Sequence, residues 1–342
     1  MKTIRKTIYI TEDVFLGAEH GNLIVKKGKE KLGEIPLLNI QNVCVFGYTS
    51  LSAALLGKCY AQGITVSLFT PGGKLQTVIA GKPSSSVLTR VEQVRLLEKK
   101  DIQLDLARNL IFAKIYNSRW IIERYCRDYA MRIGCDSLKE ISSGLNDLMI
   151  KTLQAKDQDE LRGIEGAAAQ KYFGGFDQLI LNQKDDFCFE RRSRRPPLNY
   201  MNALLSMTYS ILTNEVKSAL VGAGLDAELG FNHTLRPGRP SLALDLIEEL
   251  RPVMADRFAL SLVNRKVIQS KHFVTAETGA CMLTDEGRKI FFQQWEKQKN
   301  SELTHPFLKE KITWGLVPHV QARLFSDYIR GELDAYPNFL WK

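Results

Sequence analysis

The side chains best suited to chemistry in this sequence are a histidine and two acids in one short segment. The stretch "GFNHTLRPGRPSLALDLIEELRP" runs from Gly230 to Pro252 and contains His233, Asp245 and Glu248. Asp245 and Glu248 stand three residues apart, so on a helix they share one face. The Pro-Gly-Arg-Pro turn before them can fold the chain back so that His233 meets that face. Together with a further acid, such a nitrogen and oxygen set suits Mn²⁺ and tolerates Mg²⁺.

Glu165 is the candidate for that further acid. It lies in "LRGIEGAAAQKYFGGF", between Gly163 and Gly166 and close to three alanines. Small residues allow helices to approach closely, so we expect this face to pack against a neighbour. A carboxylate on a packed face is costly unless it is paired or binds a cation.

Each of these residues also has an ordinary structural interpretation. A single histidine in a loop is more often a hydrogen-bonding residue than a ligand, and paired acids on a helix usually form a solvated face. Glu165 can equally be an exposed glutamate on the far face of its helix. The sequence taken residue by residue leaves these alternatives open.

Arginines flank the acidic segment in two places. Within "FERRSRRPPLNYMNALLS" the basic residues are Arg191, Arg192, Arg194 and Arg195, and the turn before Asp245 adds Arg236 and Arg239. Guanidinium groups match phosphate oxygens in pairs, so these arginines can contact a nucleic-acid backbone. The alternative for the first group is a solvated charge run ahead of a helix that two prolines help to start.

Composition is consistent with a globular protein that meets a polyanion. The chain has 342 residues, enough for two domains, with 44% hydrophobic and 25% charged residues. Its net charge is +9 and its sequence pI is about 9.1. A basic surface can serve solubility or can bind nucleic acid, and charge alone does not decide between them.

Cysteine usage and hydropathy argue against a zinc module, an exported protein and a membrane protein. The six cysteines are Cys44, Cys59, Cys126, Cys135, Cys188 and Cys281. None forms a Cys-x-x-Cys pair, so we expect reduced core residues of a cytoplasmic protein. The basic start "MKTIRKTIYITEDV" lacks the apolar stretch of a signal peptide, and no apolar run approaches the roughly 18 residues of a membrane span.

The pattern of apolar residues predicts an α+β protein with two domains. Short β-branched runs, "KTIYITED", "NLIVKKG", "VCVFG", "ITVSLFT" and "LQTVIAG", predict strands, with a turn at "TPGGK" and one helix at "SLSAALLGKCYAQG". After a Gly, Pro and Ser-rich break, apolar residues recur at three- and four-residue spacing, including the ranges 138–173, 197–223, 241–268, 284–298 and 306–335. We therefore predict a β-rich domain over residues 1–82, a linker over 83–89 and an all-α domain over 90–342. The C-terminal "AYPNFLWK" is expected to pack internally rather than on a partner.

Four stretches in register resemble a known family. "GIEGAAAQKYF", "RRSRRPPLNYMNALLSMTYSILTNEV", the segment around His233 and "LTDEGRKIFFQQWE" come in this order and resemble the CRISPR-associated integrase, the metal-dependent DNA endonuclease of spacer acquisition called Cas-one. The resemblance covers nearly the whole chain. The residues from Pro237 to Leu246 and the chain length look most like the type I-C branch.

This resemblance implies a site and an assembly. By match to the family's motifs, Glu165, His233 and Glu248 are the catalytic residues and ligands of Mg²⁺ or Mn²⁺, and Asp245 is a second acid that ligates directly or through water. Asn232 departs from the aliphatic residue of many relatives. The family also implies a homodimer through the β-rich domains, and a heterohexamer with the small adaptation protein Cas-two on double-stranded and branched DNA.

The implied reaction is a transesterification in which a 3′-hydroxyl of the spacer DNA attacks a phosphodiester of the CRISPR repeat. Two other functions stay open at this point. The chain can be a non-catalytic DNA-binding scaffold of the adaptation complex, although all the expected ligands are present. It can also be a stand-alone nuclease that repairs branched DNA with the same site.

Overall fold

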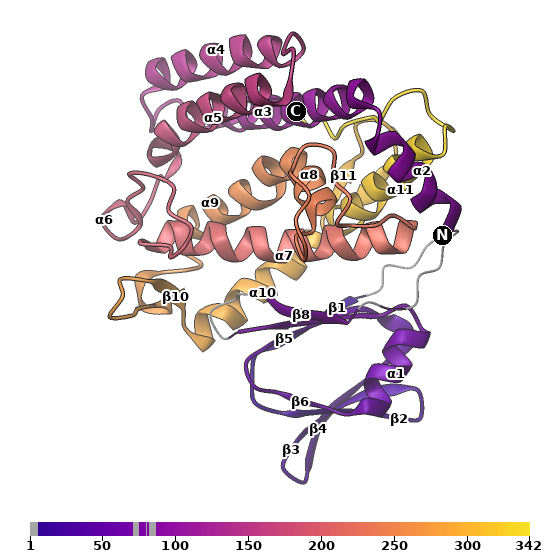
Figure 1. Ribbon diagram of the computed structural model, residues 1–342. Coiled ribbons are helices and arrows are strands. Elements are labelled where there is room, and N and C mark those ends of the chain that lie inside the picture. The colour runs from indigo at the N-terminus through magenta and orange to yellow at the C-terminus, as the bar shows by residue number, and fades with distance from the viewer. Residues whose placement is uncertain (1–5, 71–74, 80, 82–86) are drawn as a thin grey trace.

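The front of the chain forms two four-stranded sheets that face each other, as the computed structural model shows (Figure 1). The structure describes residues 6–70, 75–79, 81 and 87–342. The first sheet has the order β1 (Lys6–Ile10), β5 (Ile40–Phe46), β7 (Thr65–Phe69), β8 (Leu75–Ile79). The second has the order β4 (Glu30–Pro36), β3 (Asn22–Lys27), β2 (Phe15–Glu19), β6 (Ser50–Leu51). Helix α1 (Ala53–Ala61) lies beside them, with Ser52 as its N-cap.

Strand β5 explains why the first sheet is buried on both faces. Val43 and Val45 point into the core between the two sheets, whereas Cys44 and Phe46 join the core of the helical part. Successive side chains of a strand point to opposite faces, so a strand segment covered on both sides is apolar on both. Residues 43–46 of β5 form the uninterrupted apolar run that such burial requires, whereas Gln41 and Asn42 at the start of the strand are polar.

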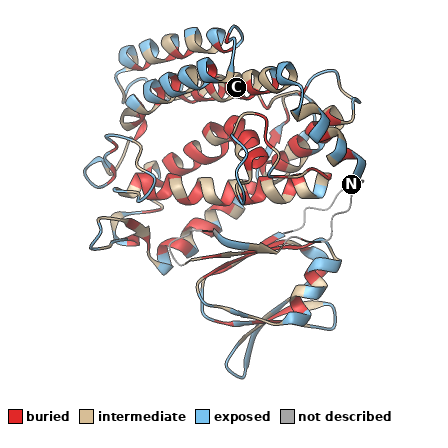
Figure 2. Ribbon diagram, viewed as in Figure 1, coloured by how far each residue is buried: buried red, intermediate tan, exposed pale blue. Residues whose placement is uncertain are grey.

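The rest of the chain is mostly helical and covers the outer face of the first sheet (Figure 1). Its longer helices are α2 (Val87–Leu97), α3 (Lys100–Asp128), α4 (Cys135–Thr152), α5 (Gln158–Gly174), α7 (Tyr200–Ala223), α8 (Ser241–Leu250), α9 (Arg257–Asn264), α10 (Asp285–Lys299) and α11 (Val317–Ile329), and α6 (Lys184–Phe187) is a single turn. Helix α8 is the most completely buried of these helices (Figure 2). A π-helical segment, Arg251–Asp256, joins α8 to α9. Among the described helices, none combines the length and the apolar character needed to cross a bilayer.

A buried polar cluster joins the two parts. Lys299 of α10 pairs with Glu215 of α7 at 2.9 Å, and it also reaches the Thr7 hydroxyl of β1 at 3.2 Å. The Tyr9 hydroxyl and the Trp295 indole N–H donate to the same Glu215 oxygen, at 3.2 and 3.1 Å. A fully paired buried carboxylate fixes its partners in place, so this cluster holds β1 against the helical part.

The predicted α+β class is confirmed, while several element boundaries differ from the prediction. Strands β2, β4 and β6 were not predicted, because they are short, charged or interrupted by glycine. The predicted helix over 138–173 is two helices, and the one over 241–268 is broken by the π-helical segment. The part that was predicted to be all-α also contains two hairpins, formed by β9 (Phe273–Thr275) with β10 (Cys281–Leu283) and by β11 (Glu302–Thr304) with β12 (Lys311–Thr313).

The predicted turn and linker fall mostly outside the described residues. Positions 71–74 of the "TPGGK" turn and positions 83–86 of the linker are not among them. Helix α2 begins at Val87, three residues before the predicted start of the helical domain at residue 90. At the C-terminus, Tyr336 and Phe339 are buried, as expected for internal packing.

Candidate metal centre

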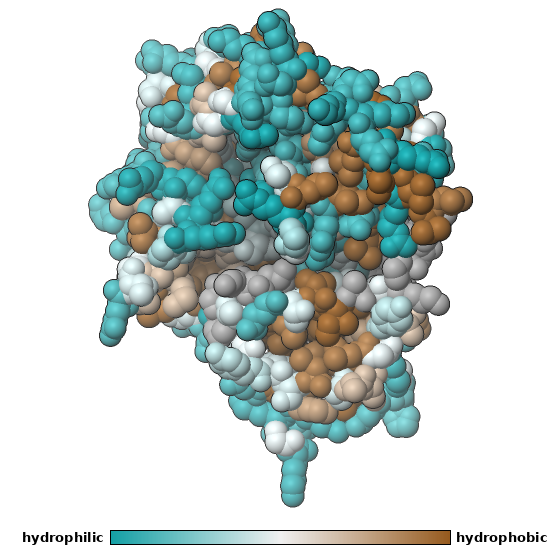
Figure 3. Space-filling model, in the orientation of Figure 1, coloured by the Kyte–Doolittle hydropathy of each residue, from teal (hydrophilic) through white to brown (hydrophobic). Residues whose placement is uncertain are grey.

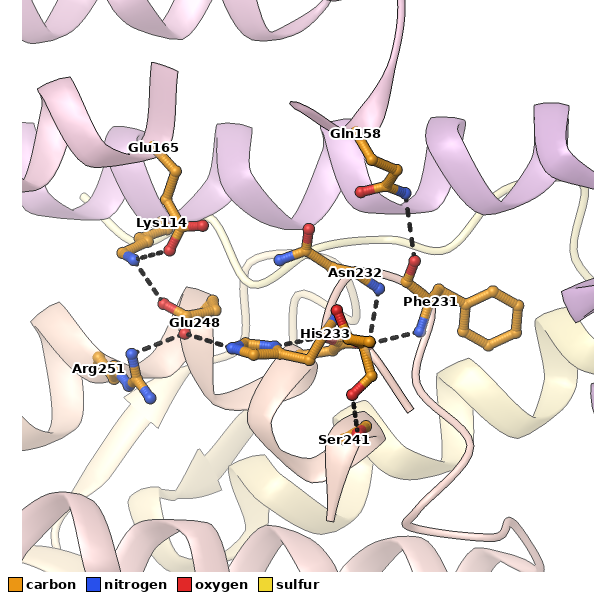
Figure 4. A network of polar contacts seen from close by, with 11 residues as sticks. Lys114, Gln158, Glu165, Phe231, Asn232, His233, Ser241, Glu248 and Arg251 are labelled. Carbon is orange, nitrogen blue, oxygen red and sulfur yellow. Dashed lines mark hydrogen bonds and ion pairs between the residues drawn. The ribbon is translucent and has the colours of Figure 1, made fainter. Parts of the chain in front are cut away.

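Three helices and one loop bring the chemically suited side chains together (Figure 4). Glu165 comes from α5, Glu248 and Asp245 from α8, and His233 from the loop that precedes α8. Lys114 of α3 lies between the two glutamates. The residues predicted from distant segments therefore meet at one place, and the structure adds a lysine to them.

Asp245 is fully buried and accepts four hydrogen bonds from the His233 loop. Its Oδ2 accepts from the backbone N–H groups of Phe231 and Asn232, at 2.6 and 3.0 Å. Its Oδ1 accepts from the backbone N–H of His233 at 2.9 Å and from His233 Nδ1 at 2.7 Å. Asp245 therefore shapes the loop, and both of its oxygens are already used.

Gly230 is the residue that lets this loop approach the helix. A Cβ at this position would lie 2.6 Å from the backbone of Ser241 and 2.7 Å from Asp245 Oδ2. Real Cβ atoms do not come so close to backbone, so any other residue would push the loop away from α8. The glycine that opens the predicted motif is thus a requirement of the close backbone contact.

The hydrogen bond to Asp245 determines which ring nitrogen of His233 keeps a free lone pair. A carboxylate can only accept, so His233 Nδ1 carries the proton and Nε2 keeps its lone pair. Nε2 faces Glu248, with 4.0 Å between it and Oε1 (Figure 4). A carboxylate that holds one ring nitrogen while the other points into a site is the usual arrangement behind a metal-binding histidine.

Glu248 is a buried carboxylate surrounded by positive charge. Its side chain is 1% exposed, and its oxygens lie 2.8 Å from Lys114 Nζ and 2.6 Å from Arg251 Nη1. Burial alone would raise its pKa, but Arg251 and Lys114 outweigh that effect and lower the pKa to about 2. Both ion pairs are close, yet neither has the alignment of a hydrogen bond, so the two oxygens lack a well-directed donor.

Glu165 is held by the same lysine. Lys114 Nζ donates to Glu165 Oε1 at 2.5 Å, and the glutamate side chain is 22% exposed. Burial would lower the pKa of Lys114, but Glu248 and Glu165 raise it instead, so the ammonium stays charged. One ammonium group therefore bridges both carboxylates, and Arg251 supplies the second positive charge.

The donor atoms of these residues are of the kind that a divalent cation takes, and Lys114 lies between the two acids. Glu165 and Glu248 offer carboxylate oxygens, and His233 offers an imidazole nitrogen whose other nitrogen is anchored. The poorly aligned donors on Glu248 and the lysine between the acids both mark a position that favours positive charge. Among the described residues, no three histidine, cysteine or acidic side chains converge closely enough to form a metal-binding group.

The expectation of a packed small-residue face on α5 was wrong. Gly163, Gly166 and Ala167 are exposed, and a Cβ on either glycine would meet nothing within 4 Å. Glu165 nevertheless turns toward Lys114 rather than to solvent. Packing of the small residues is limited to Ala168, which is buried, and Ala169, which is half-buried.

The predicted phosphate-binding arginines divide into two kinds. Arg192 donates to Asn202 Oδ1 at 2.8 Å and to the Ser206 hydroxyl at 3.1 Å, and it stacks on Tyr209. The N–H groups of Arg192 are therefore used in hydrogen bonds within the protein. The exposed members are Arg191, Arg194, Arg195 and Arg236, and Arg239 is half-buried.

Sequence reasoning missed Lys114 and Arg251. Arg251 follows Glu248 by three residues, a spacing that predicts an ion pair on a helix, so the pattern was readable. Lys114 lies 51 residues before Glu165 on another helix, and no local pattern connects them. All six cysteines are unpaired, and the expectation of core positions is confirmed for Cys44, Cys59, Cys126 and Cys281, whereas Cys135 is half-buried and Cys188 is exposed.

Comparison with known proteins gives consistent matches. The family model described as "CRISPR associated protein Cas1" matches residues 8–297. A Rhodospirillum rubrum protein named CRISPR-associated endonuclease Cas1 2 is 42% identical over 348 residues, covering 100% of both chains. A solved casposase bound to an integration product superposes with a TM-score of 0.84 at 23% identity, over 99% of this chain and 93% of that one. A Cas6-RT-Cas1–Cas2 complex gives a TM-score of 0.82 at 21% identity, over 100% of this chain and 36% of that one. At these identities the two solved structures show the fold alone.

Proposed function

The chain belongs to the CRISPR-associated Cas1 family, and from this membership and the geometry of the site we propose that it is a metal-dependent DNA endonuclease and integrase. The single observation that carries the proposal is the arrangement of His233, Glu248 and Glu165. The free nitrogen of His233 faces one acid, and a cation already bridges that acid to the other.

Three residues would hold the cation, and a fourth would position them. Glu165, His233 and Glu248 would hold Mg²⁺ or Mn²⁺, and Asp245 would keep His233 in the required tautomer. When bound, such a cation stabilises charge on a phosphodiester and lowers the pKa of an attacking hydroxyl. Direct ligation by Asp245 is disfavoured, because its oxygens already accept four hydrogen bonds.

The proposed reaction joins a spacer 3′-hydroxyl to the CRISPR repeat. The attacking oxygen forms a bond to phosphorus, the bond to the leaving 3′-oxygen breaks, and the hydroxyl proton passes to the leaving oxygen. The half-buried Arg239 and the exposed Arg191, Arg194, Arg195 and Arg236 would hold backbone phosphates and position the DNA. With water in place of the hydroxyl, the same site would nick DNA.

The proposed assembly follows the related structures. The Cas6-RT-Cas1–Cas2 complex shares this fold, and we propose a homodimer, two copies of which flank a Cas2 dimer in a heterohexamer on double-stranded or branched DNA. The type I-C subtype also stays a proposal, resting on the Pro237–Leu246 segment and the chain length. The proposed DNA substrate lies in the cytoplasm, where we expect the protein.

Cleavage and strand transfer on a branched DNA substrate test the proposal. With Mn²⁺ we expect Glu165→Gln and Glu248→Gln to lose activity by at least about a hundredfold, as the loss of a metal ligand predicts. Glu160→Gln, which changes an exposed acid of the same helix, should keep it. Near wild-type activity of Glu165→Gln would refute the proposed site, and an inactive wild type that still binds DNA would favour the scaffold alternative.

A further inference from the structure

A second concave site lies beside the C-terminal segment and includes Tyr116 of α3, the helix that also carries Lys114. This C-terminal pocket has a volume of about 910 Å³, and its lining includes Tyr116, Arg257, Phe307, Lys309, Trp341 and Lys342. The size is that of a pocket for a nucleotide-sized ligand.

The pocket is built onto the same framework as the metal centre. Tyr116 follows Lys114 by two residues on α3. The next residue, Asn117, donates to the backbone carbonyls of Glu249 on α8 and Phe339 in the C-terminal segment, at 2.7 Å each. A ligand in the pocket would therefore be held rigidly relative to the acids of the site.

Arg257 is the cationic side chain of the pocket that has no acidic partner among the described residues. Its guanidinium lies between two indole rings, 4.7 Å from the centroid of Trp314 and 4.5 Å from that of Trp341. In the described part of the chain no acid forms an ion pair with Arg257, and its nearest charged influence is Arg124. Burial and that second arginine lower the pKa of Arg257 to about 10. The faces of the guanidinium are covered by rings, so its N–H edge is left for an acceptor.

The other lining residues supply the rest of a nucleotide site. Lys309 is exposed and adds positive charge at the rim. Phe307 is 48% exposed, which leaves an aromatic face on which a base can stack. Exposed aromatic rings beside Arg and Lys side chains are what single-stranded nucleic acid needs, because each base can stack and each phosphate can be paired.

We propose that the C-terminal pocket binds a nucleotide of single-stranded DNA, with its phosphate on Arg257 and Lys309 and its base on Phe307. This proposal rests on the proposed function, since it gives the DNA substrate a second point of attachment. The single-stranded part of a branched or frayed DNA end is the ligand that fits.

Titration of the full chain with oligo(dT) of fifteen nucleotides tests the pocket. Trp314 and Trp341 line it, so we expect tryptophan quenching on binding. The titration is done in EDTA, so it does not depend on catalysis. Phe307→Ala should weaken binding about tenfold. Lys309→Gln should weaken it and lower the slope of log affinity against log salt by about 0.7.

Two controls separate the pocket from general charge and from the metal centre. Lys29→Gln removes an exposed lysine of the β3–β4 hairpin and should change affinity by less than twofold. Glu165→Gln should lose cleavage and keep the quenching, so the two proposals can fail independently. Unchanged affinity in both Phe307→Ala and Lys309→Gln would overturn the pocket proposal. Quenching by a hexaglutamate peptide but not by oligo(dT) would assign the pocket to an acidic protein segment and would also overturn it.

Discussion

At the scale of single residues, the metal centre is a balance of buried charges. Lys114, Arg251 and the acids Glu165 and Glu248 neutralise one another within a few ångströms. Removing one member of a buried ion pair leaves an uncompensated charge, which costs much more than an exposed pair contributes. We therefore expect the free energy of unfolding of the protein to depend on which positive charge lies between the two acids.

Lys114→Gln tests this dependence. We expect the free energy of unfolding in EDTA to fall by about 3 kcal/mol, because both acids lose their shared partner. Added Mn²⁺ should restore more stability to the variant than it adds to the wild type, since the ion replaces the missing charge. Chemical denaturation with EDTA and with Mn²⁺ measures both effects. The matched control is Lys31→Gln, which breaks an exposed pair with Glu34 and should cost under about 1 kcal/mol. Equal losses with and without Mn²⁺ would contradict the expectation.

At the scale of elements, the π-helical segment after α8 sets the charges behind the site. Its first residue, Arg251, pairs with Glu248, and its last residue, Asp256, lies buried among tyrosines. The hydroxyls of Tyr172 and Tyr209 donate to Asp256 at 3.1 and 2.5 Å. Single wide turns of this kind are frequent at functional sites, where they change the direction of side chains within a helix.

Asp256→Asn tests the charge of this segment. Burial raises the pKa of Asp256 to about 6 despite the two tyrosine hydrogen bonds. Because the pKa is higher in the folded protein than in the unfolded chain, where it is near 4, the carboxyl group stabilises the fold at pH values below about 4. This contribution is lost as the pH rises through about 6. Asn cannot ionise, so the free energy of unfolding of the variant should rise relative to that of the wild type by up to roughly 3 kcal/mol between pH 4 and pH 7.5.

Urea denaturation at several pH values between 4 and 7.5 measures this difference. Asp147→Asn, an exposed aspartate of α4, serves as the control and should follow the wild-type pH profile. A stability difference between Asp256→Asn and wild type that does not change with pH would show that Asp256 is ionised throughout.

At the scale of the whole molecule, the β-rich front and the helical part are joined by buried polar groups as well as by apolar contact. Lys299, Glu215 and Tyr9 form the centre of that contact. Burial would lower the pKa of Lys299, but Glu215 and Glu296 raise it, so the lysine is charged inside the interface.

The surface of the molecule carries both hydrophilic and hydrophobic residues, and hydrophilic residues cover most of the helical part in the view of Figure 3.

Lys299→Gln tests the interface. We expect a loss of about 3 kcal/mol in the free energy of unfolding, because Glu215 would keep its burial and lose its charge partner. Lys297→Gln, which changes an exposed lysine of the same helix, should stay within about 0.5 kcal/mol of the wild type. Thermal and urea unfolding measure both. Equal effects of the two substitutions would show that the interface does not depend on this ion pair.

The sequence by itself determined the α+β class and the residues of the candidate site. Apolar runs and periodicity are local properties, so strands such as β5 and helices such as α7 could be predicted. Strands such as β4 could not, because an edge strand with charged side chains lacks the apolar pattern. The ordered motifs pointed to Glu165, His233 and Glu248 by resemblance, and the family was then confirmed by comparison.

Only the tertiary structure decided how those residues divide their work. Asp245 and Glu248 look alike in the sequence, but the loop made possible by Gly230 gives one of them four hydrogen bonds. The other faces His233 and two cations. Lys114 reaches the site from a helix far away in the chain. In the C-terminal pocket, Arg257 likewise contacts Trp314 and Trp341, which lie far from it in the sequence. The physical reason is that pairing and burial depend on neighbours in space, and a linear pattern does not contain the packing that selects those neighbours.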